Sequence, residues 1–329
     1  MTRIRQFYSL FLVLVLILLT GFWSCQGSAE SLPTIGFVDA FEDDTIAKAR
    51  VGFFDALAEA GYSEADTTLS VIYRNAQGDI PTLTQIVRYM LSRQVDLIAT
   101  CPSLSTITAL QNTREVPVCM MVSPTPELMQ VMSATDDAPA NLFGVAENLG
   151  YIDTSFSLIP KLLREKSEPV RVGLLYNQSE PQSVDAFNRI QQIASRENAV
   201  LVGLPVNTSA DVQLVTAALL NEGVDAFFAM PDNTIFAAFE TILQSCEEAG
   251  VPIFTSEAGL VARGAVAAYG ADLYAWGQQA GRQAAQMLDQ GSSEGLSWEL
   301  VKVRRKVYRP DAVERYGLTI PEGYEVFGE

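Results

Sequence analysis

The stretch Val95-Asp96-Leu97-Ile98-Ala99, which leads to Pro102, is repeated in kind by Val224-Asp225-Ala226-Phe227-Phe228-Ala229, which leads to Pro231. Each is a short apolar run of the kind that forms a buried parallel strand. Both stand within a series of alternating strand and helix patterns, which is typical of a parallel sheet covered by helices. One such pair can arise by chance, so the rest of the sequence is needed to decide whether the chain repeats its fold.

Two further echoes occur in the same order along the chain. Gly36-Phe37-Val38 is matched by Gly173-Leu174-Leu175, and Val116-Pro117-Val118 is matched by Val251-Pro252-Ile253. Three echoes in one order favour an α/β fold with two similar lobes, each a parallel sheet flanked by helices. One large doubly wound sheet is the alternative, because strand–helix alternation alone is compatible with it.

The first half of the sequence shows the pattern most clearly. Strands are expected at 34–38, 69–74, 96–100 and 118–122, and helices over 46–60 and from near Pro81 and Ser103. The helix over 46–60 places Phe53 and Leu57 on one face and ends at Gly61.

The composition excludes several classes of function. The chain has 329 residues, 48% hydrophobic and 19% charged, as in a globular protein of about two domains. With 22 basic and 39 acidic residues its net charge is −17, which disfavours a nucleic-acid partner because phosphates would be repelled. Histidine is absent from the sequence, which excludes Ser-His-Asp and Cys-His catalysis and His-ligated metals. We expect neither a cofactor nor a metal.

The first residues have the features of an export signal. Arg3 and Arg5 precede an apolar run over 10–19. Ser24-Cys25 follows, and its surroundings resemble the lipobox of bacterial lipoproteins. We therefore expect a signal peptide over 1–24, a lipid anchor on Cys25 and a linker over 25–33. Cleavage after Ala29 and an uncut anchor are the alternatives.

All three alternatives place the bulk of the protein outside the cytoplasm, where disulfides can form. Three cysteines then remain, Cys101, Cys119 and Cys246. An odd number leaves at least one unpaired, and burial as small apolar side chains is expected for all three.

The turns after the strands are the places to look for a site. Ligands of open α/β sheets bind beyond the carboxyl ends of the strands, where helix N-termini present free N–H groups. If the two lobes face one another across a hinge, all of these turns converge on one cleft.

Four stretches stand out among these turns and the region that follows them: Arg74-Asn75-Ala76-Gln77-Gly78-Asp79, Tyr176-Asn177-Gln178-Ser179-Glu180, Pro231-Asp232-Asn233-Thr234 and the stretch from Gly264 to Gly277. Together they resemble the substrate-binding proteins of ABC importers, in particular the group associated with tryptophan and tyrosine. The resemblance covers the chain from Thr34 to the end. Two turns depart from the family pattern, Thr100-Cys101-Pro102-Ser103-Leu104 and Ser123-Pro124.

The resemblance implies a type I periplasmic-binding-protein fold whose chain crosses a three-stranded hinge. Lobe 1 would contain 34–144 and 271–300, and lobe 2 would contain 145–270 and 301–329. The implied partners are an ABC permease and an ATPase, with membrane attachment through the lipid anchor.

A free amino acid presents an ammonium, a carboxylate and a side chain, and a closed cleft must satisfy all three. Asp232, with Asn233 beside it, is expected to bind the ammonium, and a helix N-cap is its equally weighted alternative. The carboxylate is assigned to hydroxyl groups, for each of which capping is the alternative: Ser103, Ser105, Ser179 and Ser183. The remaining candidates are aromatic side chains and cleft-facing polar groups: Phe41, Tyr176, Tyr274, Ser123, Glu257 and, from the resemblance alone, Asn75.

Three functions compete at this point. The leading one is a non-catalytic solute receptor that closes around a small molecule and delivers it to a permease. The second is a ligand sensor for a membrane kinase or chemoreceptor. The third is a Cys-dependent hydrolase using Cys101, which stands at a strand end. The basic cluster over 302–306 is interpreted as a solvated strand face rather than a phosphate site.

Overall fold

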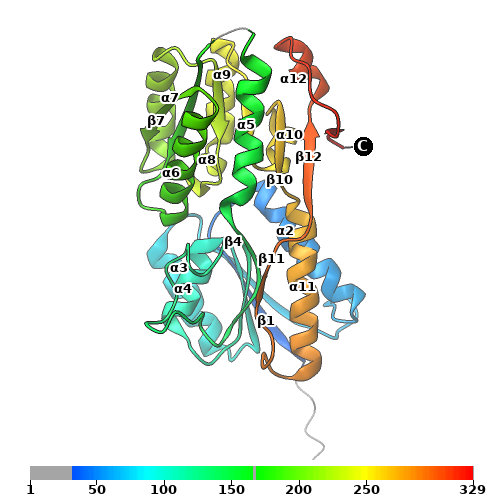
Figure 1. Ribbon diagram of the computed structural model, residues 1–329. Helices are drawn as coiled ribbons and strands as arrows, with labels where there is room; N and C mark the ends of the chain where they lie inside the picture. The colour runs from blue at the N-terminus through cyan, green and yellow to red at the C-terminus, as the bar shows by residue number, and fades with distance from the viewer. Residues whose placement is uncertain (1–31, 166–167, 329) are drawn as a thin grey trace, which may run out of the picture. The chain divides into compact units, whose positions relative to one another are not determined.

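A computed structural model describes residues 32–165 and 168–328. The predicted signal peptide, the lipobox and Cys25 therefore lie outside the described residues. In the part that is described, no helix combines the length and apolarity needed to cross a membrane. The chain from Pro33 onward is built around two sheets, each covered by helices (Figure 1).

Within the described ranges, the first sheet has six strands in the order β11-β5-β4-β3-β1-β2, all paired in parallel. They are β1 (Thr34–Asp39), β2 (Ser70–Asn75), β3 (Leu97–Cys101), β4 (Val118–Pro124), β5 (Leu142–Glu147) and β11 (Trp298–Leu300). The helices around it are α2 (Asp44–Glu59), α3 (Ile80–Ser92), α4 (Ser103–Asn112) and α11 (Leu273–Gln290). The four strands expected in the first half are confirmed to within two residues.

Alternating side chains bury both faces of this sheet, as the period of a strand requires. Phe37 packs in a core with α2 and α11, whereas Val38 packs on the opposite face in a core with α3 and α4. The helices α2 and α11 approach so closely that a Cβ at Gly277 would lie 1.8 Å from the Ala49 carbonyl oxygen. Only glycine fits at that contact.

Over the same described ranges, the second sheet has seven strands in the order β13-β12-β10-β9-β8-β6-β7. They are β6 (Val170–Tyr176), β7 (Ala199–Pro205), β8 (Ala226–Ala229), β9 (Ile253–Thr255), β10 (Ala267–Ala271), β12 (Arg304–Tyr308) and β13 (Glu325–Val326). β12 pairs antiparallel with β10, so this lobe adds a returning strand to its parallel sheet.

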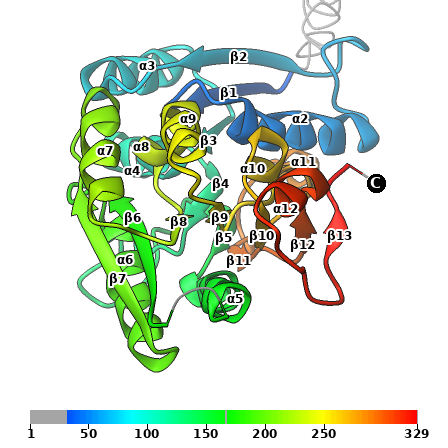
Figure 2. The ribbon, with the colours of Figure 1, turned by 90° about the horizontal axis from the view of Figure 1, so that it is seen from above.

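Helices cover both faces of the second sheet. α5 (Ile152–Leu163) and α6 (Pro181–Arg196) share one core with β6 and β8. The other face is covered by α7 (Val212–Asn221), α9 (Phe239–Ala249) and α10 (Ala258–Arg263) (Figure 2). Shorter elements complete the lobe: η1 (Leu149–Tyr151), η2 (Ser209–Asp211), α8 (Asn233–Ala237) and α12 (Pro310–Arg315).

The two lobes repeat one topology. The strand order β2-β1-β3-β4-β5 of the first corresponds to β7-β6-β8-β9-β10 of the second. The three sequence echoes fall on β1 and β6, on β3 and β8, and on the starts of β4 and β9. The predicted fold class, an α/β protein of two similar lobes, is confirmed, and the single-sheet alternative is wrong.

Three segments connect the lobes within the described chain: β5 to η1, β10 to α11 and β11 to β12. They lie side by side, because the Val301 amide donates to the Ala146 carbonyl at 2.8 Å and the Asp272 amide donates to the Val303 carbonyl at 3.2 Å. These connections form the base of the space between the lobes.

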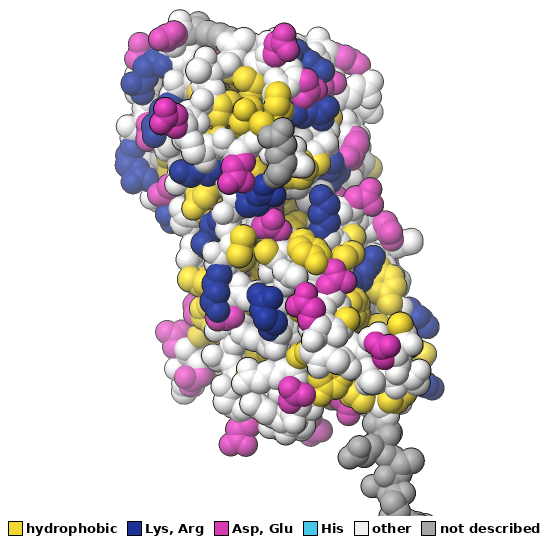
Figure 3. Space-filling model, turned by 90° about the vertical axis from the view of Figure 1, so that its right-hand side faces the viewer, with side chains coloured by type: hydrophobic (Ala, Val, Ile, Leu, Met, Phe, Trp, Pro, Cys, Tyr) yellow, Lys and Arg dark blue, Asp and Glu magenta, His cyan; other side chains and the backbone are white. Residues whose placement is uncertain are grey.

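One face of the surface is shown in Figure 3. Acidic and basic side chains are interspersed over it, so this face offers no continuous basic patch for a phosphate backbone.

Candidate functional site

A cavity of about 60 Å³ lies between the two lobes, at the carboxyl ends of their strands. The turns after β3, β4, β5, β8 and β9 all contribute to its lining. Its polar lining residues are Ser103, Ser123, Glu147, Gln182, Asp232, Asn233 and Glu257. No Lys or Arg is among the described residues that line it, so the lining is acidic as well as polar.

The rest of the lining is apolar and aromatic: Val122, Pro124, Leu149, Tyr151, Pro231, Phe236 and Trp276. Trp276 comes from α11 and is fixed by its indole N–H, which donates to the Val145 carbonyl at 2.9 Å. A wall of this kind suits an apolar or aromatic ligand group, with the few polar side chains setting its orientation.

Asp232 is buried, and its carboxylate is fully engaged. Oδ1 accepts from the amides of Thr234 and Ile235 at 2.8 and 3.0 Å, which is the geometry of an N-cap on α8. Oδ2 accepts from the Asn177 amide at 2.8 Å and the Ser183 hydroxyl at 2.5 Å. The capping alternative is therefore what the structure displays, and ammonium binding by Asp232 stays a prediction.

Glu180 lies beside Asp232 and forms the second half of a buried acidic pair. Its Oε2 accepts from the side-chain amides of Gln182 at 2.6 Å and Asn233 at 2.8 Å. Burial, followed by the charge of Asp232, raises the pKa of Glu180 to about 8. Burial also raises the pKa of Asp232, against the four hydrogen bonds that lower it.

Glu257 differs from the other acids of the cavity. Its side chain is 4% exposed, and Oε2 has no hydrogen-bond partner among the described residues. Burial, followed by the charges of Glu147 and Asp43, raises the pKa of Glu257 well above its ordinary value. Buried polar atoms are nearly always paired in proteins, so an unpaired carboxylate oxygen that faces a cavity makes Glu257 a candidate for ligand binding.

Glu147 ends β5 and is neutralised by Arg304 of β12. The guanidinium donates to both carboxylate oxygens, at 2.6 and 2.8 Å. Burial raises the pKa of Glu147, and the Arg304 contacts oppose that effect. The interpretation of 302–306 as a solvated strand face therefore fails at Arg304, because this side chain turns toward the connections between the lobes and pairs there.

The predicted site residues fall into three groups. Ser103, Ser123, Asp232, Asn233 and Glu257 line the cavity. Phe41 and Ser179 instead line a larger and more open groove of about 520 Å³, which also includes Glu180.

The remaining five predicted residues make contacts of their own. The Ser105 hydroxyl donates to the Cys101 carbonyl, and the Ser183 hydroxyl donates to Asp232. Asn75 donates to the Phe41 carbonyl, and the Tyr176 ring stacks on that of Phe187. Tyr274 donates to Asp55 and is 38% exposed. The structure does not bring Tyr274 to the cavity; Trp276, two residues on, faces it instead.

Sequence reasoning missed Glu147, Tyr151, Gln182, Phe236 and Trp276. Two signals were available. The run Leu142-Phe143-Gly144-Val145-Ala146 ends at an acid, as β1 does at Asp39, and would have indicated Glu147. The segment 271–300, which the resemblance assigns to lobe 1, follows a crossing between the lobes, and this would have indicated residues of the first turn of its helix, α11.

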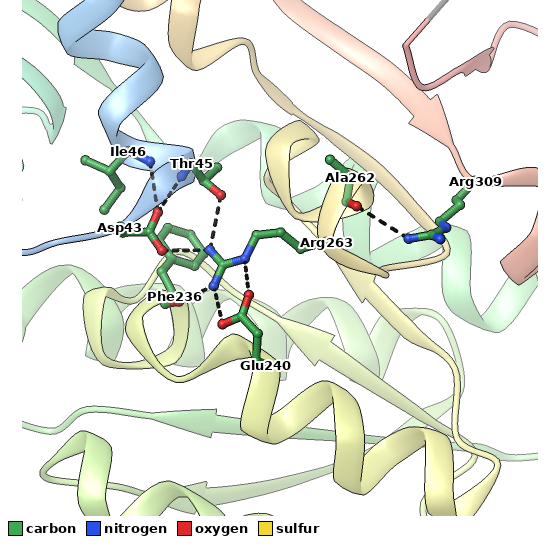
Figure 4. A network of polar contacts seen from close by, with 8 residues as sticks. All are labelled: Asp43, Thr45, Ile46, Phe236, Glu240, Ala262, Arg263 and Arg309. Atoms are coloured by element: carbon green, nitrogen blue, oxygen red, sulfur yellow. Dashed lines mark hydrogen bonds and ion pairs between the residues drawn. The ribbon is translucent and has the colours of Figure 1, made fainter.

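Arg263 of α10 links the lobes near the cavity (Figure 4). On its own lobe it donates to Glu240 at 2.7 and 2.8 Å and to the Phe236 carbonyl at 3.0 Å. Across the gap it donates to Asp43 at 2.6 Å and to Thr45 at 3.1 Å, at the start of α2. We call the contacts of Arg263 with Asp43 and Thr45 the Arg263 bridge.

The cysteines do not support nucleophilic chemistry. Cys101, Cys119 and Cys246 are free and buried, as expected. Burial, followed by the charge of Asp39, raises the pKa of the Cys101 thiol well above its ordinary value. A reactive cysteine needs the opposite shift, so the Cys101 hydrolase alternative is disfavoured.

Two like lobes, three connecting segments and a cavity at the facing strand ends define a bilobed solute-binding protein. The chain belongs to the family described as ABC transporter substrate binding protein, whose model matches residues 34–326. This is a family of binding proteins and not of enzymes, as expected.

The chain is 29% identical over 261 residues to a tyrosine-binding protein of Clostridioides difficile (strain R20291), covering 79% of this chain and 74% of that one. Among solved structures, it is similar to a domain from Streptococcus pneumonia in complex with L-Trp, with 22% identity, a TM-score of 0.80 and coverage of 89% and 97%. It is also similar to the ligand-free, open structure of a Clostridium difficile substrate binding protein with adhesive properties, with 22% identity, a TM-score of 0.64 and coverage of 89% and 99%. At these identities the two structures show the shared fold.

Proposed function

We propose that the protein is the extracytoplasmic substrate-binding subunit of an ABC importer and that its ligand is an aromatic amino acid held in the interlobe cavity. The observation that carries the proposal is the lining of that cavity. It combines an aromatic wall of Tyr151, Phe236 and Trp276 with buried carboxyl groups and the N-terminus of α4. These three parts match the side chain, the ammonium and the carboxylate of such a ligand.

The ligand carboxylate is assigned to the N-terminus of α4. Ser103 is the first residue of this helix, and the preceding Pro102 provides no side-chain cap for its amides. Unsatisfied N–H groups and the helix dipole attract an anion there. The ammonium is assigned to the acidic side of the cavity, where Asp232 and Glu257 lie.

The contacts available in the cavity can supply the binding free energy needed to capture a ligand present at micromolar concentration. Hydrogen bonds to charged groups contribute about 1.5–3 kcal/mol each. Two or three of them, with contact between the ligand ring and the aromatic wall, reach the roughly −8 kcal/mol of micromolar binding.

Binding requires the lobes to move. A cavity of about 60 Å³ takes several water molecules, whereas pockets for small organic ligands occupy about 300–1,000 Å³. A hinge at the three connecting segments opens the cleft for entry, and the lobes then close around the ligand. The Arg263 bridge, which joins the lobes beside the cavity, is a contact of the closed form.

Two relatives support the choice of ligand. One curated relative is named for tyrosine binding, and a protein of the same fold was solved with L-Trp. The importer context adds a permease and an ATPase as partners and a lipid anchor on Cys25. Replacing Cys25 by Ser is expected to release the protein from the membrane fraction, and intact-mass measurement of the wild type is expected to show the lipid.

The test is titration calorimetry of the folded chain against the twenty amino acids, nucleosides and small sugars. We expect saturable binding of tryptophan, tyrosine or phenylalanine and none of the sugars. Ser103→Ala is expected to weaken binding of these amino acids, with Ser195→Ala on the exposed surface of α6 as the matched control. Tight binding of a nucleoside or sugar, with no response to any amino acid, would reject the proposed ligand class.

A further inference from the structure

The carboxyl group of Glu257 occupies an unusual position at the end of β9. It precedes α10, faces the cavity and is 4% exposed, and Oε2 has no hydrogen-bond partner within the described chain. A carboxyl left unpaired at such depth is costly in either protonation state, because an ion lacks solvation and a neutral acid lacks a hydrogen-bond partner.

The charged and titratable groups that face Glu257 come from four elements. Glu147 at the end of β5 is paired with Arg304 of β12, and Asp43 before α2 is paired with Arg263. Tyr151 of η1 lines the same cavity, as does Asp232, which has four donors of its own.

Each neighbouring acid therefore has its own partners. The guanidinium groups of Arg263 and Arg304 already form ion pairs with Asp43 and Glu147. No Lys or Arg is among the described residues that line the cavity. No group of the described chain is thus left to pair with Glu257 Oε2, which favours a group of the ligand as its partner in the occupied cavity.

We propose that Glu257, rather than Asp232, binds the ammonium group of the ligand, and that it gives up a proton to solvent as the ion pair forms. This inference rests on the proposed function for the rest of the ligand. In the empty cavity Glu257 is a neutral acid; when the ligand enters as R–NH₃⁺, the acidic proton leaves to the buffer and the carboxylate accepts hydrogen bonds from the ammonium. One proton is released per ligand bound.

The empty cavity favours the neutral acid because burial, Glu147 and Asp43 all raise the pKa of Glu257. Binding of an ammonium favours the carboxylate. Affinity for an amine-bearing ligand therefore rises with pH, by about tenfold per unit for as long as Glu257 is protonated in the free protein. A ligand without the amine cannot drive the proton off.

The experiment compares four probes on the folded protein: L-tryptophan, L-tyrosine, tryptamine and indole-3-propionate. The last two lack the carboxylate and the amine, respectively. Titration calorimetry in two buffers of different ionisation enthalpy, at several pH values, gives the affinity and the number of protons released. The first variant, Glu257→Gln, keeps the shape of the side chain and removes its acid. The control variant, Glu42→Gln, removes the charge of an exposed side chain that lines the 520 Å³ groove.

For the wild type we expect release of one proton with tryptophan or tyrosine and an affinity that rises with pH. Glu257→Gln is expected to abolish the proton release and to weaken these ligands about 10- to 100-fold. Its affinity for indole-3-propionate should be unchanged relative to the wild type. Glu42→Gln is expected to behave like the wild type.

The outcomes separate the two proposals. If amino acids bind equally well to Glu257→Gln, or if affinity falls as pH rises, the inference fails and the proposed function stands. If tryptamine binds with proton release while amino acids do not, the inference stands and the amino-acid ligand is wrong. If no probe that carries an amine binds the wild type, the inference fails with the proposed ligand class.

Discussion

Replacing Arg263 by Gln tests whether contacts between the lobes set the affinity for ligand. The Arg263 side chain is 16% exposed and that of Asp43 is 3% exposed, so their ion pair is largely shielded from water. The variant loses the Asp43 contact at 2.6 Å and the Thr45 contact at 3.1 Å. Asp43 still caps α2 through Oδ1, which accepts from the Thr45 and Ile46 amides, so the helix should stay intact.

The magnitude follows from what is lost on closure. A hydrogen bond to a charged group contributes about 1.5–3 kcal/mol, and the open form gives Asp43 back to water, so no buried charge is stranded there. When the free protein is mostly open, ligand binds only the small closed population. A substitution that lowers this closed population raises the apparent dissociation constant by the factor of that decrease. We expect Arg263→Gln to bind its ligand about 10- to 100-fold more weakly.

The assay is titration calorimetry with L-tryptophan or L-tyrosine, combined with small-angle scattering of the ligand-bound protein. The matched control is Glu240→Gln, since Glu240 contacts the same guanidinium within one lobe and is 66% exposed. An exposed pair contributes little, so the control should change affinity by less than about fivefold. If Arg263→Gln keeps its melting temperature and binds as tightly as the wild type, the bridge does not contribute to closure and the reasoning is wrong.

Three further predictions concern the acidic pair, the helix contact and the cavity wall. Because the pKa of Glu180 is about 8 in the folded protein and 4.5 is its ordinary value, the folded state holds an extra proton between these values and melting temperature should fall as pH rises through that window, less steeply in Glu180→Gln. Gly277→Ala forces a Cβ to within 1.8 Å of the Ala49 carbonyl and should lower the free energy of unfolding by about 1–3 kcal/mol in urea, and an unchanged midpoint would contradict the packing. In a titration with phenylalanine, which does not add to the indole signal, Trp276→Phe should remove the ligand-dependent change in tryptophan fluorescence and leave the signal of the other tryptophans, whereas persistence of that change would place the ligand elsewhere.

The duplicated fold could be predicted because its signals are local. An apolar run such as 95–99 is buried on both faces of a parallel sheet, and its match at 224–229 occupies the equivalent strand of the other lobe. The returning strand β12 had no such signal. Its residues, Arg-Arg-Lys-Val-Tyr, do not alternate between polar and apolar, and its antiparallel pairing with β10 depends on where the chain re-enters the lobe.

The site was predictable only as far as the turns themselves. Five of the twelve predicted binding residues reach the cavity, and each of these stands at or directly after the end of a strand. Which way a side chain points within a turn depends on contacts with other parts of the fold. The Ser105 hydroxyl donates to the Cys101 carbonyl at the end of β3, and the Tyr274 hydroxyl donates to Asp55 on α2.

Asp232 and Glu257 show why residue type and spacing do not identify the binding group. Both are acids after an apolar strand and before a helix, so the sequence treats them alike. The difference is in the donors that surround them: Asp232 receives two amides from its own helix and two donors from the β6–α6 turn, whereas Glu257 receives none at Oε2. Asn177 and Ser183 stand 55 and 49 positions before Asp232 in the sequence, and the acids that raise the pKa of Glu257 lie on the other side of the cleft. A carboxylate whose oxygens already accept hydrogen bonds from the protein stabilises its own lobe, whereas one with an oxygen that accepts none has hydrogen-bonding capacity left for a ligand.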